Sequence, residues 1–336
     1  MARGLPWLHA VVRSGRYHTG VALDEIVAAD RDALEALDAR LKTLLPPDYQ
    51  ETYEKMEPVP MRSAGLKFDV HGQVAWDQIW GSFCDLAMAG GPPHKGALLE
   101  HGSVDAIDAE FARYDEVVEE ICRGIRMATG LRAYPSPTPG WACVTCHGDA
   151  MAGWLLRAIV MENVDARRRG AVLELPAAPH FRLDREIKNV ITVIAKTCHY
   201  WLGHMPAAQR HAIAALLSRM DAESLLLTPS ADADAGPRTD ASRSAAGAAI
   251  GRLTGLRTAE PRSAGWLGLE CGDVRPAVWM MRALVAANVL SRREGTVLYL
   301  PINATLDPDG DRVATDVAHA FRCARARGIV AGEGER

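Results

Sequence analysis

The sequence lacks several features that would assign it to a well-known class. None of its apolar runs reaches the roughly 18 residues that cross a bilayer, and residues 1–10 lack the apolar core of a signal peptide. We therefore expect a soluble, cytoplasmic protein with no membrane partner. Seven cysteines, an odd number spread over 336 residues, are not a disulfide framework and are typical of reduced thiols.

Strong charge of one sign is also missing. The formal net charge is −4 at pH 7, so the chain has no overall basic field and general attraction to nucleic acid is not expected. The sequence contains no GxGxxG, GxxxxGK[ST], HExxH or GxSxG motif. What it does contain is 48% hydrophobic residues, enough to bury one large core or several smaller ones.

Periodic apolar positions predict several amphipathic helices. Spacings of three and four residues mark helices over 22–45, 74–88, 107–128 and 184–205. Residues 228–248 hold small and polar side chains only, which predicts a flexible linker. The resulting division is an N-terminal helical region (1–133), a first unit with central helices (141–227), the linker (228–248), and a second unit with a C-terminal helix (249–336).

An internal repeat lies at an offset of 125 residues. Residues 154–176 read WLLRAIVMENVDARRRGAVLELP, and residues 279–301 read WMMRALVAANVLSRREGTVLYLP. Aligned without a gap, the two segments share 13 of 23 residues. Each copy predicts a helix, a turn with Arg-Arg-x-Gly, and two short strands that end at a proline.

A helix followed by a two-stranded hairpin resembles the last helix and the wing of the winged-helix fold. The predicted fold class is therefore mainly α with short β-hairpins (α+β), in which two duplicated winged-helix-like units pack with additional helices. In DNA-binding members that helix carries polar residues on its exposed face. Here it carries Trp154-Leu155-Leu156 and Trp279-Met280-Met281, which favour burial in a scaffold or in a homodimer contact over nucleic-acid binding.

The segment from Cys143 to His147 reads CVTCH, a pattern typical of covalent haem attachment. Cys146 recurs as Cys271 at the same repeat position, and the second copy has no CxxC partner, so Cys146 is expected in the core. This leaves Cys143 and His147 as candidate metal ligands. We add His204 as a third candidate, although a histidine near a helix end also suits the negative end of the helix dipole.

The helix over 184–205 has two chemically different faces. One is an apolar stripe, and the other is a polar seam of Arg185, Asn189, Thr192, Lys196 and His199. If protein encloses this seam, its polar groups need partners, and a polar or anionic ligand would provide them. The alternative is an ordinary solvent-facing stripe.

The loop Gly90-Gly91-Pro92-Pro93-His94-Lys95-Gly96 is a second candidate site. Its glycines and prolines fix an unusual backbone path that could place His94 for proton transfer or metal ligation. Lys95 would add positive charge near a helix N-terminus. The alternative is a rigid connection between helices.

These observations lead to one hypothesis and one rival. The hypothesis is an enzyme that acts on a small polar or anionic substrate, with histidine-bound iron or zinc, or haem, as its cofactor. Its catalytic residues would be His94, His199 and Lys196, and Asn189, Lys95 and Arg185 would bind the substrate. The rival is a non-catalytic tandem winged-helix protein that binds a partner protein or DNA.

Overall fold

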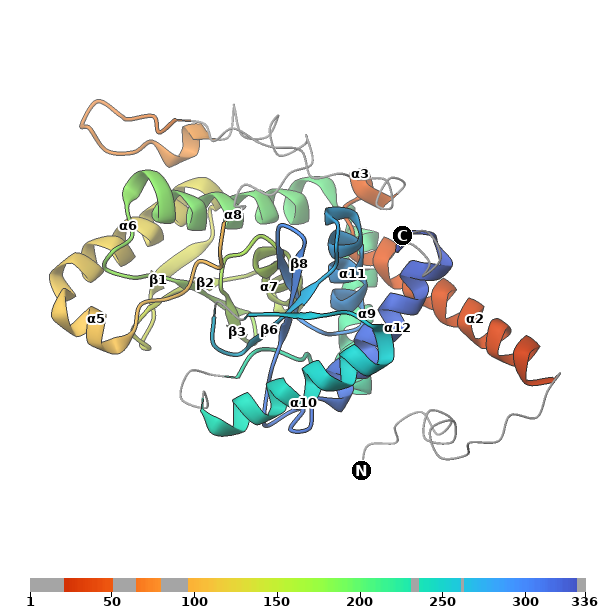
Figure 1. The fold of residues 1–336 in the computed structure, drawn as a ribbon. Coiled ribbons are helices and arrows are strands. Elements are labelled where there is room, and N and C mark those ends of the chain that lie inside the picture. The colour runs from red at the N-terminus through yellow and green to blue at the C-terminus, as the bar shows by residue number, and fades with distance from the viewer. Residues whose placement is uncertain (1–20, 51–64, 80–95, 231–235, 261–262, 331–336) are drawn as a thin grey trace. The chain divides into compact units, whose positions relative to one another are not determined.

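The duplicated segments fold alike, and the repeat is much longer than 23 residues. The computed structural model describes residues 21–50, 65–79, 96–230, 236–260 and 263–330. Within these residues the order helix, two strands, helix, two strands, helix occurs twice (Figure 1). The first copy contains α6 (Phe111–Thr129), β1 (Arg132–Pro135), β2 (Trp141–Thr145), α7 (Asp149–Met161), β3 (Arg167–Arg169), β4 (Val172–Pro176) and α8 (Lys188–His199). The second contains α10 (Pro237–Thr254), β5 (Thr258–Ala259), β6 (Trp266–Glu270), α11 (Val274–Ala286), β7 (Arg292–Glu294), β8 (Val297–Pro301) and α12 (Asp311–Ala326).

Details of the backbone recur at the same offset of 125 residues. Gly130 and Gly255 end α6 and α10 in the left-handed conformation, at φ 72° and 74°. The sequence Thr-Gly-Leu-Arg stands at 129–132 and again at 254–257, and β2 and β6 each begin with a tryptophan that follows a glycine. The duplication therefore covers a whole helix-and-sheet unit and not only the helix and hairpin that sequence alignment reveals most clearly.

Each copy builds one four-stranded antiparallel sheet. The strand orders are β1-β2-β4-β3 and β5-β6-β8-β7, and Trp141 and Trp266 stand opposite Pro176 and Pro301. Side chains alternate between the two faces of a strand, so Leu173 and Leu175 occupy one face of β4 and Glu174 the other. The leucines are fully buried in the core.

The winged-helix expectation holds only at the level of a mixed α+β fold. Helix-plus-hairpin units do occur twice, but β2 and β6 come directly before α7 and α11. A helix-turn-helix would have a second helix there. The hairpin β3-β4 belongs to the larger sheet, because β4 pairs with β2 as well as with β3.

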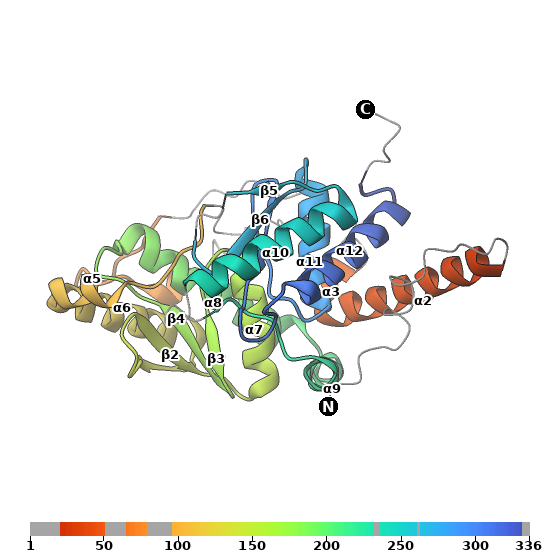
Figure 2. The same ribbon diagram turned by 60° about the horizontal axis from the view of Figure 1, so that its bottom comes forward.

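Residues 236–248 are not a flexible linker. They begin the 18-residue helix α10, which packs along α12 (Figure 2). Its small side chains permit a close approach: a Cβ atom added at Gly310, before α12, would lie 2.5 Å from the Cβ of Ala246. The Ser242 hydroxyl also donates a hydrogen bond to the Pro308 carbonyl, so small residues here indicate tight packing.

Further helices lie outside the two repeats in the sequence. The helix expected over 184–205 is continuous, because α8 is extended at both ends by single π-helical turns, η2 (Leu183–Ile187) and η3 (Tyr200–His204).

No described helix is long and apolar enough to cross a membrane. The chain divides into two compact units, Met1–Ala39 and Arg40–Arg336, and the sites described below lie in the second. The remaining elements are α2 (Val21–Leu44), α3 (Pro47–Gln50), η1 (Trp76–Ile79), α5 (Val104–Ala109) and α9 (Ala207–Glu223).

The two copies meet at their helix-hairpin junctions, each of which is built on an asparagine. Asn163 and Asn288 follow α7 and α11 with φ values of 60° and 65°, in the left-handed region that asparagine tolerates. Asn163 Nδ2 donates to the Arg293 carbonyl at 2.7 Å, and Arg157 donates to the side-chain oxygen of Asn288. Both asparagines are buried, so these contacts join the copies within the core.

Candidate functional site

A cavity of about 170 Å³ lies between the two copies. Helix α7 contributes Trp154, Ala158 and Met161, and α11 contributes residues at equivalent helical spacing. Because these positions are three and four residues apart, each helix presents one apolar stripe to the cavity. The other apolar lining residues are Leu41, Leu44, Leu45, Pro46, Val278, Met281 and Val285.

Polar groups stand at a few points of this apolar wall. Lys196 Nζ forms an ion pair with Glu162 Oε1 at 2.7 Å, and both side chains are largely buried. Arg157 is also buried, and burial lowers its pKa to about 10. Burial likewise lowers the pKa of Arg293, with Glu162 acting in the opposite direction. The cavity therefore combines a hydrophobic body with charged groups that could fix the orientation of a ligand.

Two of the buried polar atoms at the cavity have no hydrogen-bond partner among the described residues. They are Nε of Arg157, a donor, and Oε2 of Glu162, an acceptor. Buried polar atoms are rarely left unpaired, since each costs about 1–3 kcal/mol. A bound molecule or water with both donor and acceptor groups would satisfy them.

A histidine pair lies beside the cavity, at the C-terminal end of α8. His199 Nε2 and His204 Nε2 are 3.0 Å apart, and His204 Nδ1 lies 2.9 Å from Asp48 Oδ2. Burial and the neighbouring His204 lower the pKa of His199. Tyr200, which lines the cavity, has its ring 5.4 Å from that of His204, so the pair is close to any molecule bound there.

The hydroxyl groups of Tyr200 and Tyr49 are also in contact, at 2.6 Å. Burial and this hydrogen bond raise the pKa of Tyr200. Both tyrosines line the cavity. Their hydroxyl groups add hydrogen-bonding capacity to the wall next to the histidines.

The polar seam of the helix over 184–205 is enclosed in part. Thr192 and Lys196 are buried, Asn189 and His199 are half-buried, and Arg185 is exposed. Lys196 lines the cavity, whereas the other members of the seam do not. The alternative of a fully solvent-facing stripe is therefore wrong for the middle of the helix.

The remaining predicted site residues that the structure describes do not line this cavity. His94 and Lys95 lie outside the described residues, so their expected approach to His199 stays a prediction. Cys143 lies on β2, His147 is exposed just before α7, and His204 contacts His199 and Asp48. Across the described part of the chain, no three His, Cys, Asp or Glu side chains are arranged to bind a metal ion, and the ligand set of Cys143, His147 and His204 stays a prediction.

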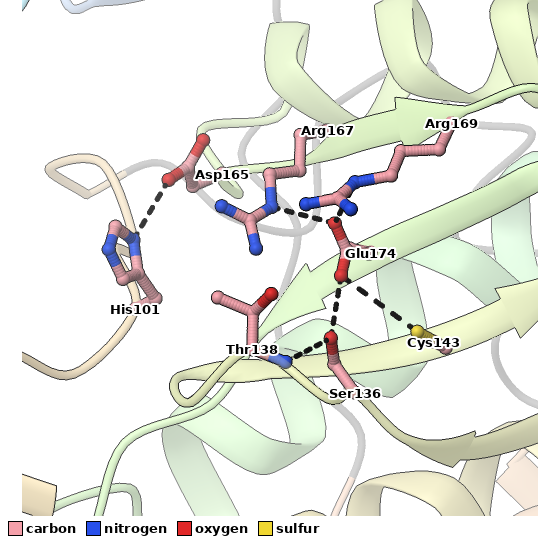
Figure 3. A network of polar contacts seen from close by, with 8 residues as sticks. All are labelled: His101, Ser136, Thr138, Cys143, Asp165, Arg167, Arg169 and Glu174. Carbon is pink, nitrogen blue, oxygen red and sulfur yellow. Dashed lines mark hydrogen bonds and ion pairs between the residues drawn. The ribbon is translucent and has the colours of Figure 1, made fainter. Parts of the chain in front are cut away.

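A second polar network lies on the face of the first sheet that carries Glu174, whose side chain is almost completely buried (Figure 3). Ser136 Oγ donates to Glu174 Oε1 at 2.6 Å, and Arg167 Nε donates to Glu174 Oε2 at 2.7 Å. Burial alone would raise the pKa of Glu174, but these hydrogen bonds lower it below its usual value. The Cys143 thiol also donates to Glu174, and burial raises the pKa of that thiol.

Comparison of the two copies separates the structural part of this network from what is particular to the first copy. Arg167 stacks on Trp141 at 4.1 Å, and the equivalent Arg292 stacks on Trp266 at 4.8 Å. The arginine-tryptophan pair is therefore part of the shared scaffold. The counterpart of Glu174 in the second copy is Tyr299. This difference within the aligned repeat is the signal in the sequence by which the network of the first copy could have been found.

His101 and Asp165 extend the network at its edge (Figure 3). Their side chains are 3.4 Å apart, and the His101 ring stacks on Trp141 with ring centres 4.5 Å apart. Sequence reasoning missed both residues, since neither belongs to a motif.

Comparison of the chain with known protein families, with curated proteins and with solved structures finds no match.

Proposed function

We propose that this protein binds a small, mostly apolar molecule in the cavity between its two copies. The observation that carries the proposal is the cavity itself, which is lined by apolar stripes from both copies and by a buried ion pair. A dry cavity of about 150 Å³ can hold one benzene ring, so about 170 Å³ suits a single ring or a short acyl chain. Lys196, Glu162 and Arg157 would contact a polar group on that molecule.

Binding can be tested with a panel of single-ring and six- to eight-carbon carboxylates, alcohols and amines. Titration calorimetry and thermal unfolding should identify members that bind one per chain and raise the melting temperature. Ala158→Trp should abolish this binding, because the larger side chain would fill the cavity. Leu253→Trp is the control, since Leu253 is exposed on α10.

Two results would contradict the proposal. One is that no member of the panel stabilises the wild-type chain. The other is that Ala158→Trp binds as well as Leu253→Trp while both variants remain folded. Circular dichroism of each variant without ligand checks the fold.

Catalysis on the bound molecule is a second candidate function. It is favoured by the position of His199 and His204 next to Tyr200, because imidazole groups can transfer protons near neutral pH or bind a metal. For panel members that bind, turnover would be followed by mass spectrometry. His204→Gln should remove turnover but leave binding of the molecule intact. Equal turnover by the wild-type protein and the variant would argue against a catalytic role for the histidines.

The rival proposal is binding to DNA or to a partner protein through the hairpins. The apolar residues of α7 and α11 are already buried within the chain, which removes the surface that a recognition helix would need. The arginines of the first hairpin contact carboxylates, since Arg167 pairs with Glu174 and Arg168 with Asp221. An electrophoretic shift with duplex DNA tests the nucleic-acid form, and sedimentation tests self-association.

A further inference from the structure

The histidine pair owes its geometry to an unusual turn of helix. In a regular α-helix, residues five apart point in directions about 140° different, so His199 and His204 would diverge. Tyr200–His204 is instead a π-helical turn, and such turns occur frequently at functional sites. The wider turn brings the two Nε2 atoms to 3.0 Å.

Asp48 determines which nitrogen of His204 can accept a hydrogen bond or bind a metal ion. Its carboxylate lies 2.9 Å from Nδ1, so that nitrogen carries a hydrogen and donates it. Nε2 of the neutral ring then has a lone pair that points toward His199. A carboxylate that orients the far nitrogen of a histidine is the usual support of a histidine metal ligand.

The separation of the two nitrogens also fits a shared metal ion. Two imidazole nitrogens at about 2.1 Å from one ion lie about 3.0 Å apart in neighbouring octahedral positions and about 3.4 Å apart in a tetrahedron. The observed 3.0 Å falls within this range. The alternative is a plain hydrogen bond between the rings, in which one Nε2 carries a hydrogen and the other accepts it.

We propose that His199 and His204 bind one divalent transition-metal ion through their Nε2 atoms, with Asp48 holding the ring of His204. Imidazole ligands suit zinc, nickel, copper and iron. Two protein ligands leave further positions for water or for a bound molecule. Tyr200 lies between the histidines and the cavity, so this ion would be adjacent to the site proposed above without depending on it.

The test is a zinc titration of the full chain by calorimetry. The wild-type protein should bind one zinc ion at this site. His199→Gln and His204→Gln should each remove that binding or weaken it by at least tenfold. Asp48→Asn should weaken it by about 10–100-fold, as for other residues that support a metal ligand. His147→Gln is the matched control, because this exposed histidine should leave the affinity unchanged.

A second measurement needs no variant. Zinc should protect His199 and His204 of the wild-type chain, but not His147, from diethyl pyrocarbonate, with the modified residues mapped by mass spectrometry. Absence of zinc binding, or binding that persists unchanged in both histidine variants, would overturn the proposal. Equal modification of His199 and His204 with and without zinc would do the same.

Discussion

At the scale of single residues, the duplication provides matched pairs in different surroundings. Trp154 and Trp279 occupy equivalent positions and both are buried. Nε1 of Trp154 donates to the Leu44 carbonyl at 2.8 Å, whereas Nε1 of Trp279 has no partner among the described residues. The same side chain therefore makes a hydrogen bond in one copy and packs without one in the other.

Replacement of each tryptophan by phenylalanine should separate these two roles. Trp154→Phe loses ring volume and a hydrogen bond, while Trp279→Phe loses the same volume and an unsatisfied donor. We expect Trp154→Phe to lower the free energy of unfolding by about 1–2 kcal/mol more than Trp279→Phe does. Urea unfolding measures both, and equal losses would show that the Leu44 contact contributes nothing.

Glu174 provides a pH-dependent prediction. Its pKa is lowered in the folded protein, so its ionised form stabilises the fold at pH values above the usual carboxyl pKa. That stabilisation is lost as the pH falls through the lowered folded pKa. Glu174→Gln should cost about 1–3 kcal/mol at pH 7, and its difference from wild type should shrink below about pH 4.

The matched control is Glu270→Gln in the second copy. Glu270 pairs with Arg257 at the surface, and such exposed pairs contribute about 0–1 kcal/mol. Chemical unfolding between about pH 3 and pH 7 compares the two variants. A Glu174→Gln loss that stayed constant over this range would mean that the carboxylate charge is not what stabilises the network.

At the scale of secondary-structure elements, each helix-hairpin junction requires a residue that adopts positive φ and also forms buried hydrogen bonds. Asn163 Nδ2 donates to the Gly96 and Arg293 carbonyls, and Asn288 Nδ2 donates to the Ser224 carbonyl and to Asp221. Asparagine tolerates the left-handed backbone, and its side-chain amide also donates hydrogen bonds to the chain that passes beside each junction. Its presence in both copies follows from these two requirements.

Alanine and glycine variants distinguish the two requirements. Asn163→Ala and Asn288→Ala should each cost about 3 kcal/mol, from two buried hydrogen bonds and a strained backbone. The corresponding glycine variants should cost about 1 kcal/mol less, because glycine adopts positive φ freely. If the glycine and alanine variants unfold at the same urea concentration, backbone strain is not part of the cost.

At the scale of the whole molecule, the two copies are one folding unit. Buried contacts cross between them, including those from Arg157 to Asn288 and from Asn163 to Arg293, and Arg40–Arg336 form one compact unit. Separation of the copies would expose these polar groups together with the apolar wall of the cavity. Neither copy is therefore expected to be stable alone.

Calorimetry provides the test of this expectation. The full chain should show one cooperative unfolding transition for residues 40–336, and fragments 96–204 and 224–330 expressed separately should show none. Two separate transitions in the full chain would mean that the copies are independent domains. Mixing the two fragments should restore structure if the interface alone holds them together.

Local patterns in the sequence determined much of this architecture. Apolar spacing located the helices at 22–45 and 184–205, and the offset of 125 residues identified the duplicated helix and hairpin. These features depend on residues close to one another in the chain, so periodicity and alignment reveal them. The polar seam of the helix over 184–205 was also visible in the sequence, but whether protein encloses it was left open until the structure placed Lys196 in the interior.

Only the tertiary structure decided the rest. Whether small residues form a linker or a closely packed helix depends on a distant partner, as Ala246 and Gly310 show. Glu174 meets Ser136 through strand pairing, and His204 meets Asp48, 156 residues away, through helix packing. Periodicity records which face of an element is apolar but not which other element that face will meet. Sequence patterns singled out Lys196, His199 and His204 one by one. The cavity and the contact of His204 with Asp48 depend on packing between distant elements, which is why the sequence alone did not bring these residues into one site.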